Sequence, residues 1–218
     1  GMINGVAQPI LANVSDSNER QERVFRKMLR FTAFVSFPAL FGLSLITPEL
    51  ITITITDKWS ASADILKILC IGGAFNSVSN LYSNLIISRG KSNIYMWNTI
   101  VLGVTQAIIM WCCHPFGIPT MIKVYVAINI FWLLVWQYFV WKEIGFTFLD
   151  ALKDILPFFL VAAGTMCITY YITSGVTNIY YSFVFKVIIA AIVYSLVMWL
   201  SGSVTFKESV EYLRKWKK

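Results

Sequence analysis

The sequence predicts an all-α protein, a polytopic membrane helix bundle of about six transmembrane helices with both chain ends in the cytoplasm. Of the 218 residues, 57% are hydrophobic and only 13% are charged. The charges gather in short stretches. The apolar runs between them reach the length of about 20 residues that a helix needs to cross a hydrocarbon core of about 30 Å. The eight Trp residues fit rings placed at the two membrane interfaces.

The first 30 residues precede the bundle. Residues 1–14 are moderately apolar and too short to span a membrane, and we interpret them as the end of a preceding helix. Residues 15–30 are strongly charged, while Phe25, Met28 and Leu29 recur at helical spacing. This pattern predicts a cytoplasmic amphipathic connection, either an interfacial helix or a solvated one.

The first span is expected from Phe31 to Ile46, and its helix could continue to Ile55. Pro38 lies inside it, and a proline there removes a backbone hydrogen bond and favours a kink or hinge. The second span lies in the stretch from Ile65 to Ser92, which is apolar except for a line of amides. The segment between these two spans marks the outer interface.

Four further spans complete the bundle, which occupies residues 31–201. They are expected at residues 94–113, 120–141, 156–172 and 179–200. We interpret residues 142–153 as an amphipathic connection on the inner side, and residues 202–218 as a basic cytoplasmic tail.

The positions of the basic residues support this topology. Of the 18 Lys and Arg residues, all but Lys58, Lys67, Lys123 and Lys186 fall in segments assigned to the cytoplasm. Because cytoplasmic loops of membrane proteins carry an excess of Lys and Arg, the bias predicts six spans with both ends inside. The same bias accounts for the net charge of +7, so we expect no nucleic-acid partner.

The sequence lacks the residues that a metal site or a catalytic site would need. His114 is the single histidine, and beside Cys112 and Cys113 it does not have the usual spacing of zinc ligands. No Ser-His-Asp arrangement or phosphate-binding glycine loop is present. We therefore expect no enzyme activity, no metal and no cofactor.

Three amides share one face of the second span. Asn76, Asn80 and Asn84 follow one another at steps of four residues, which places them on one side of a helix. An amide that faces lipid costs several kcal/mol unless it finds a partner. The stripe predicts either the lining of a substrate cavity or hydrogen bonds to a neighbouring helix.

Lys186 lies about seven residues into the sixth span. It is either a cation of a central cavity that meets an anionic group of a substrate, or a lysine that snorkels outward or pairs inside the protein. Together with the three amides it completes the set of substrate-binding candidates. Weaker candidates are Gln106, Asn129 and Gln137, whereas Lys67 and Lys123 are interpreted as structural.

Several short landmarks follow one another along the chain. They are Gln8-Pro9-Ile10-Leu11-Ala12, Phe37-Pro38, Gly42-Leu43, Pro48-Glu49-Leu50-Ile51, Lys58-Trp59, Ile68-Leu69-Cys70-Ile71-Gly72-Gly73-Ala74-Phe75, Ser88-Arg89-Gly90-Lys91-Ser92 and Pro115-Phe116-Gly117-Ile118. In this order they resemble the C-terminal half of bacterial polysaccharide flippases of the O-antigen and lipopolysaccharide type, which belong to the multidrug/oligosaccharidyl-lipid/polysaccharide exporter superfamily.

The resemblance implies transport across the bacterial cytoplasmic (inner) membrane. Members of the family move an oligosaccharide linked to undecaprenyl pyrophosphate from the inner to the outer leaflet, by alternating access of two bundles around a polar cavity. Because they have an N-terminal lobe before this region, we expect the chain to be a C-terminal fragment. Its implied partners are the lipid-linked oligosaccharide and the missing lobe, in cis or in trans. Lys186 is a candidate from its depth alone.

Three alternatives accompany this hypothesis. A cation-coupled drug exporter of the same superfamily would need a buried carboxylate to bind the ion, and Glu49 and Asp64 are the nearest acidic residues. A non-transporting membrane assembly module would need no substrate site. A membrane enzyme would be expected to have larger outer loops with charged or His residues.

Overall fold

The computed structural model describes residues 2–176 and 178–200, and within them every regular element is helical. The elements are α1 (Met2–Ala12), α2 (Asn18–Thr54), η1 (Asp57–Trp59), α3 (Ser60–Ser88), α4 (Ser92–Cys113), η2 (His114–Phe116), α5 (Ile118–Ile144), α6 (Phe148–Thr173) and α7 (Ile179–Leu200). Six helices, α2 to α7, are long and apolar enough to cross a membrane. The predicted fold class, a polytopic membrane bundle of six helices, is therefore confirmed. The expected basic tail at residues 202–218 lies outside the described residues.

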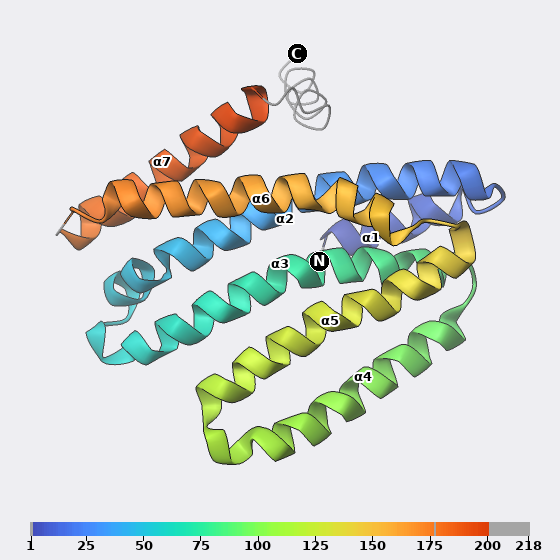
Figure 1. Cartoon of the computed structure of the whole chain (residues 1–218), viewed down its shortest axis with the longest axis horizontal. Coiled ribbons are helices and arrows are strands. Elements are labelled where there is room, and N and C mark those ends of the chain that lie inside the picture. The colour runs from blue at the N-terminus through green and yellow to red at the C-terminus, as the bar shows by residue number, and fades with distance from the viewer. Residues whose placement is uncertain (1, 177, 201–218) are drawn as a thin grey trace.

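The spans follow one another across the bundle in the order α7, α6, α2, α3, α5 and α4 (Figure 1). Helix α2 packs against α3, α6 and α7, while α3 packs against α5 and α1. Helix α4 packs mainly against α5. Helices α2 and α3 therefore occupy the centre of the bundle, and α4 and α7 lie at its edges.

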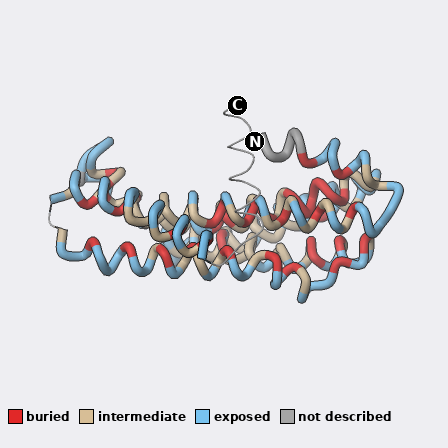
Figure 2. Tube along the Cα trace, turned by 90° about the horizontal axis from the view of Figure 1, so that it is seen from above, coloured by how far each residue is buried: buried red, intermediate tan, exposed pale blue. Residues whose placement is uncertain are grey.

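Buried positions gather toward one end of the bundle (Figure 2). There Phe25 of α2 packs edge-on against Tyr82 of α3 and Phe146 of the α5–α6 connection, with ring centroids 5.2 and 5.4 Å apart. The same end carries Lys91, before α4, and Lys142, near the end of α5. We call it the basic end, and it is the end predicted to face the cytoplasm.

Helix α2 is one continuous helix, so the charged segment expected as a connection in residues 15–30 and the span expected from Phe31 belong to the same helix. The helix begins after Ser17, whose side chain accepts a hydrogen bond from the Arg20 amide. No helix-breaking residue follows until the apolar half has begun. One side of the charged half packs into the bundle. Its buried residues are Gln21, Phe25 and Leu29.

Pro38 lies inside α2 without ending the helix. Proline has no backbone N–H, so the carbonyl of Phe34, four residues earlier, loses its helical hydrogen-bond donor. The Tyr194 hydroxyl of α7 donates to that carbonyl at 2.9 Å. Helix α2 changes direction between its two halves (Figure 1), and a neighbouring helix supplies the hydrogen bond that the proline leaves open.

Helix α6 begins at Phe148, well before the expected start of the fifth span. Helix α5 ends at Gly145, whose positive φ of 76° is a left-handed conformation that favours glycine. Thr147 then caps α6 by accepting a hydrogen bond from the Asp150 amide at 3.3 Å. Residues 148–153, which were expected in an amphipathic connection, are thus the first turns of a long helix.

Candidate functional site

The three amides of α3 differ in how far the bundle covers them. Helix α3 is continuous and keeps Asn76, Asn80 and Asn84 on one face. Asn76 is exposed, Asn80 is half-buried, and Asn84, which lies nearest the basic end, is buried. Ala74 and Val78, on the opposite side of α3, are fully buried in the core. The described helices therefore leave Asn76 exposed, cover Asn80 in part and cover Asn84 almost fully.

Lys186 forms a buried ion pair with Glu49. The Lys186 ammonium donates to the Glu49 Oε1 atom, and the hydroxyl of Ser182, one turn earlier on α7, donates to the same oxygen at 2.9 Å. Lys186 is 7% exposed and Glu49 is 8% exposed. Of the two interpretations made from the sequence, the structure thus has the lysine paired inside the protein, where it joins α7 to α2.

The Glu49 carboxylate is held through one of its two oxygens. Its Oε2 atom is buried and has no hydrogen-bond partner among the described residues. Buried carboxylate oxygens usually accept hydrogen bonds, so this atom is an exception. The pairing was not foreseen from the sequence, although Glu49 and Lys186 each lie between one and two turns from the helix ends opposite the basic end. This shared depth is the signal that could have linked them.

Helix α6 turns three threonines toward the interior. Thr165, Thr169 and Thr173 follow at steps of four residues and are all buried. The hydroxyls of Thr169 and Thr173 each donate at 2.8 Å to a carbonyl four residues earlier in α6. The sequence analysis missed this line, although its spacing is the same signal as that of the asparagines. Because two of the three hydroxyls bond within their own helix, the line serves mainly packing.

Two of the weaker candidates are used within the fold. The Asn129 amide donates to the Tyr125 carbonyl, one turn earlier in α5, at 2.8 Å. The Gln137 amide donates to the Phe146 carbonyl at 2.8 Å and so closes the connection between α5 and α6. Both side chains therefore have structural roles.

At the basic end, Asp154 of α6 joins two arginines of α2. Its side chain is 2% exposed and accepts hydrogen bonds from Arg26 Nε at 2.8 Å and Arg30 Nε at 2.7 Å. Asp150 lies 3.6 Å from Arg26, at the edge of the same cluster. These contacts fix the start of α6 on the charged half of α2.

The Cys112-Cys113-His114 cluster lies where α4 passes into η2. In the part of the chain that the structure describes, no three His, Cys, Asp or Glu side chains are grouped so that they could hold a metal ion. The four cysteines are free thiols, namely Cys70, Cys112, Cys113 and Cys167.

Comparisons with known proteins agree with the resemblance drawn from the landmarks. A family model described as "Polysaccharide biosynthesis protein" matches residues 1–64. An uncharacterized membrane protein in the cps region of Klebsiella pneumoniae is 26% identical over 79% of this chain. The lipopolysaccharide biosynthesis protein WzxC of Escherichia coli is 28% identical over 43% of the chain, and the teichuronic acid biosynthesis protein TuaB of Bacillus subtilis is 25% identical over 75%. No solved structure matches the chain.

The chain spans only part of these relatives. The matched region covers 32% of the Klebsiella protein, 19% of WzxC and 34% of TuaB. The comparisons confirm that the chain resembles multi-pass bacterial membrane proteins of polysaccharide biosynthesis.

Proposed function

We propose that this chain is part of a transporter in the bacterial cytoplasmic membrane that moves lipid-linked oligosaccharide from the inner to the outer leaflet. The lipid would be undecaprenyl pyrophosphate, and the product would enter a cell-surface polysaccharide. Three relatives from polysaccharide-producing systems support the pathway. The observation that carries the proposal is the amide face of α3, a helix long and apolar enough to cross a membrane, on which Asn76 is exposed and Asn80 is half-buried.

The chemistry of this face suits a sugar. An amide that faces hydrocarbon loses its hydrogen bonds to water, and the loss costs several kcal/mol unless a polar partner replaces them. Sugar hydroxyls donate and accept hydrogen bonds, as amides do, and Asn76 and Asn80 would bind them along one side of α3. The oligosaccharide cannot cross hydrocarbon unaided, whereas its lipid tail can stay in the bilayer.

A second bundle would complete the cavity. The chain matches about a third of the length of two relatives, so a further lobe, in cis or in trans, would have room to face α3. Pro38 inside α2 supports alternating access, because a proline weakens the helix and lets one half move relative to the other. In this account the chain transports and does not catalyse.

Two alternatives, the cation-coupled drug exporter and the non-transporting assembly module, are less well supported. A cation-coupled drug exporter would use Glu49 to bind its ion, but the Lys186 ammonium already pairs with one oxygen of that carboxylate and supplies its counter-charge. An assembly module would have no need for the exposed amide of Asn76 on a helix long enough to cross a membrane.

The test is the variant Asn76→Leu with Asn80→Leu in the complete protein, expressed in a strain that lacks its own copy. We expect surface polysaccharide to fall about tenfold or more, which corresponds to the loss of at least ~1.4 kcal/mol of sugar binding. Lipid-linked oligosaccharide should accumulate while the amount of the protein in the membrane stays normal.

Asn129→Leu is the matched control, because that amide is bonded within α5. Normal surface polysaccharide in the double variant would overturn the proposal. A changed drug susceptibility with normal polysaccharide would instead support the exporter.

A further inference from the structure

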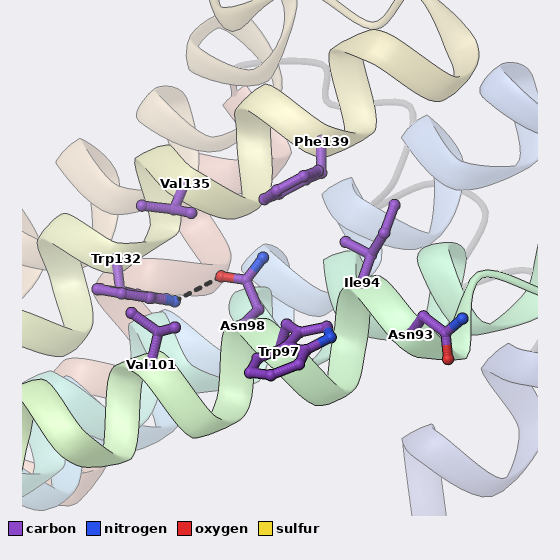
Figure 3. A pocket seen from close by; sticks show the side chains of 8 residues that line it. All are labelled: Asn93, Ile94, Trp97, Asn98, Val101, Trp132, Val135 and Phe139. Atoms are coloured by element: carbon purple, nitrogen blue, oxygen red, sulfur yellow. Dashed lines mark hydrogen bonds between the residues drawn. The ribbon is translucent and has the colours of Figure 1, made fainter.

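A cavity of about 400 Å³ lies between α4 and α5 (Figure 3). It runs along the half of each helix that lies nearer the basic end. Its walls are mostly apolar, and their main residues are Ile94, Trp97, Val101, Trp132, Val135 and Phe139.

The main polar contact across this cavity is already made. The Trp132 indole N–H donates to Asn98 Oδ1 at 3.0 Å, across the space between the two helices (Figure 3). Asn98 is the one residue of α4 that is buried. The indole and the amide oxygen therefore satisfy each other, and what remains of the wall is a surface for hydrocarbon.

The cavity opens toward the surroundings of the bundle. Trp97 and Val101, which line it, are 61% and 48% exposed. On a membrane-spanning helix these side chains face lipid. An apolar hollow that is left empty forfeits dispersion contacts along its whole lining, and water gains too few hydrogen bonds there, so a hydrocarbon chain is its natural occupant.

Basic side chains lie at one end of this hollow. Lys142 follows Phe139 by one turn and Val135 by two turns, so it continues the same face of α5. It is exposed, and the described part of the chain provides no ion-pair partner for it. Lys91, at the start of α4, pairs with Glu143 of α5 at 2.6 Å and shows that the two helix ends meet there. Within the described residues, the end of the hollow thus carries a positive charge without an ion-pair partner.

We propose that the cavity between α4 and α5 binds an anionic phospholipid of the leaflet at the basic end. One acyl chain would lie along Trp97, Val101 and Val135, and the phosphate would contact Lys142. In a phospholipid the acyl chain extends from the phosphate into the membrane. The apolar walls of the cavity extend from the Lys142 end of α5 in the same way. The leaflet predicted at this end, the cytoplasmic one, is where membranes attract basic side chains through anionic lipids.

The experiment is native mass spectrometry of the complete protein, released from nanodiscs that contain equal amounts of phosphatidylglycerol and phosphatidylcholine. We expect phosphatidylglycerol to be retained in preference. Lys142→Gln should lower that preference about fivefold, the effect of one basic group at a membrane surface. Val135→Trp, which fills the cavity, should lower retention of both lipids.

Lys153→Gln is the matched control, since it removes an exposed positive charge from α6 near the same end. The proposal is overturned if both lipids are retained equally, or if Lys142→Gln behaves like Lys153→Gln. It is also overturned if added undecaprenyl phosphate displaces phosphatidylglycerol at equal concentration, because the cavity would then belong to a polyprenyl lipid.

Discussion

The Lys186 ammonium of α7 is bonded to the Glu49 carboxylate of α2, and both side chains are buried between helices that are each long enough to cross a membrane. Burying this pair removes water from both charged groups, and that free-energy cost offsets most of their attraction. The pair therefore adds little net stability. Losing one partner is far more costly, because the other charge stays buried alone. The pair therefore fixes how α7 sits on α2.

Lys186→Met should destabilise the protein by about 3–5 kcal/mol, because it leaves the Glu49 carboxylate buried without a counter-charge. Adding Glu49→Gln should restore most of that loss. Thermal unfolding of the complete protein in detergent measures both. Lys123→Met is the control, since Lys123 is exposed on α5. A single variant as stable as the parent would contradict the buried ion pair between Lys186 and Glu49.

Pro38 has no N–H to donate to the Phe34 carbonyl, and the Tyr194 hydroxyl donates to that carbonyl instead. Tyr194→Phe should cost about 1–3 kcal/mol, the penalty of leaving a partly buried carbonyl without its partner. In a Pro38→Ala background the helix supplies its own N–H, so the same change should cost clearly less. A double-mutant cycle by thermal unfolding tests this coupling.

The control for that cycle is Tyr180→Phe, because Tyr180 is 65% exposed. Equal costs of Tyr194→Phe in both backgrounds would mean that the hydroxyl does not compensate for the proline.

Asp154→Asn should loosen the start of α6. The change removes the negative charge that binds Arg26 and Arg30, and each hydrogen bond to a charged group contributes about 1.5–3 kcal/mol. Hydrogen exchange of the backbone amides in residues 148–157 should become faster, while exchange in α3 stays unchanged. Asp64→Asn is the matched control, since Asp64 forms an ion pair whose acidic side is 77% exposed. Unchanged exchange at α6 would contradict the role of this cluster.

The fold class was predictable because hydropathy and charge placement are local properties of a membrane chain. The spans follow from hydropathy and the shared face of Asn76, Asn80 and Asn84 follows from spacing, whereas the order of the helices across the bundle did not. The start of α2 was not predictable in this way, because its charged half looks like an interfacial helix until Phe25 is seen to pack between Tyr82 and Phe146. Contacts between distant segments decide that difference.

The ion pair of Glu49 and Lys186 shows the same limit. The sequence analysis considered Glu49 as a ligand for a coupling ion and Lys186 as a cation of a substrate cavity, and it did not connect the two. Only the packing of α2 against α7 brings them together. The sequence gives the depth of each charge in the membrane and leaves open which helix lies beside it, so a pairing between helices far apart in the chain requires the structure.

The most direct measurement of the central claim is photo-crosslinking from the amide face of α3 to the substrate. A photoreactive amino acid would replace Asn76 or Asn80 in the complete protein, in cells that label their lipid-linked oligosaccharide with a radioactive sugar. The account predicts labelled adducts from both positions and none from Trp111, which is 84% exposed on α4. Adducts that are absent at both α3 positions, or equally strong at Trp111, would contradict the claim that this face of α3 meets the sugar.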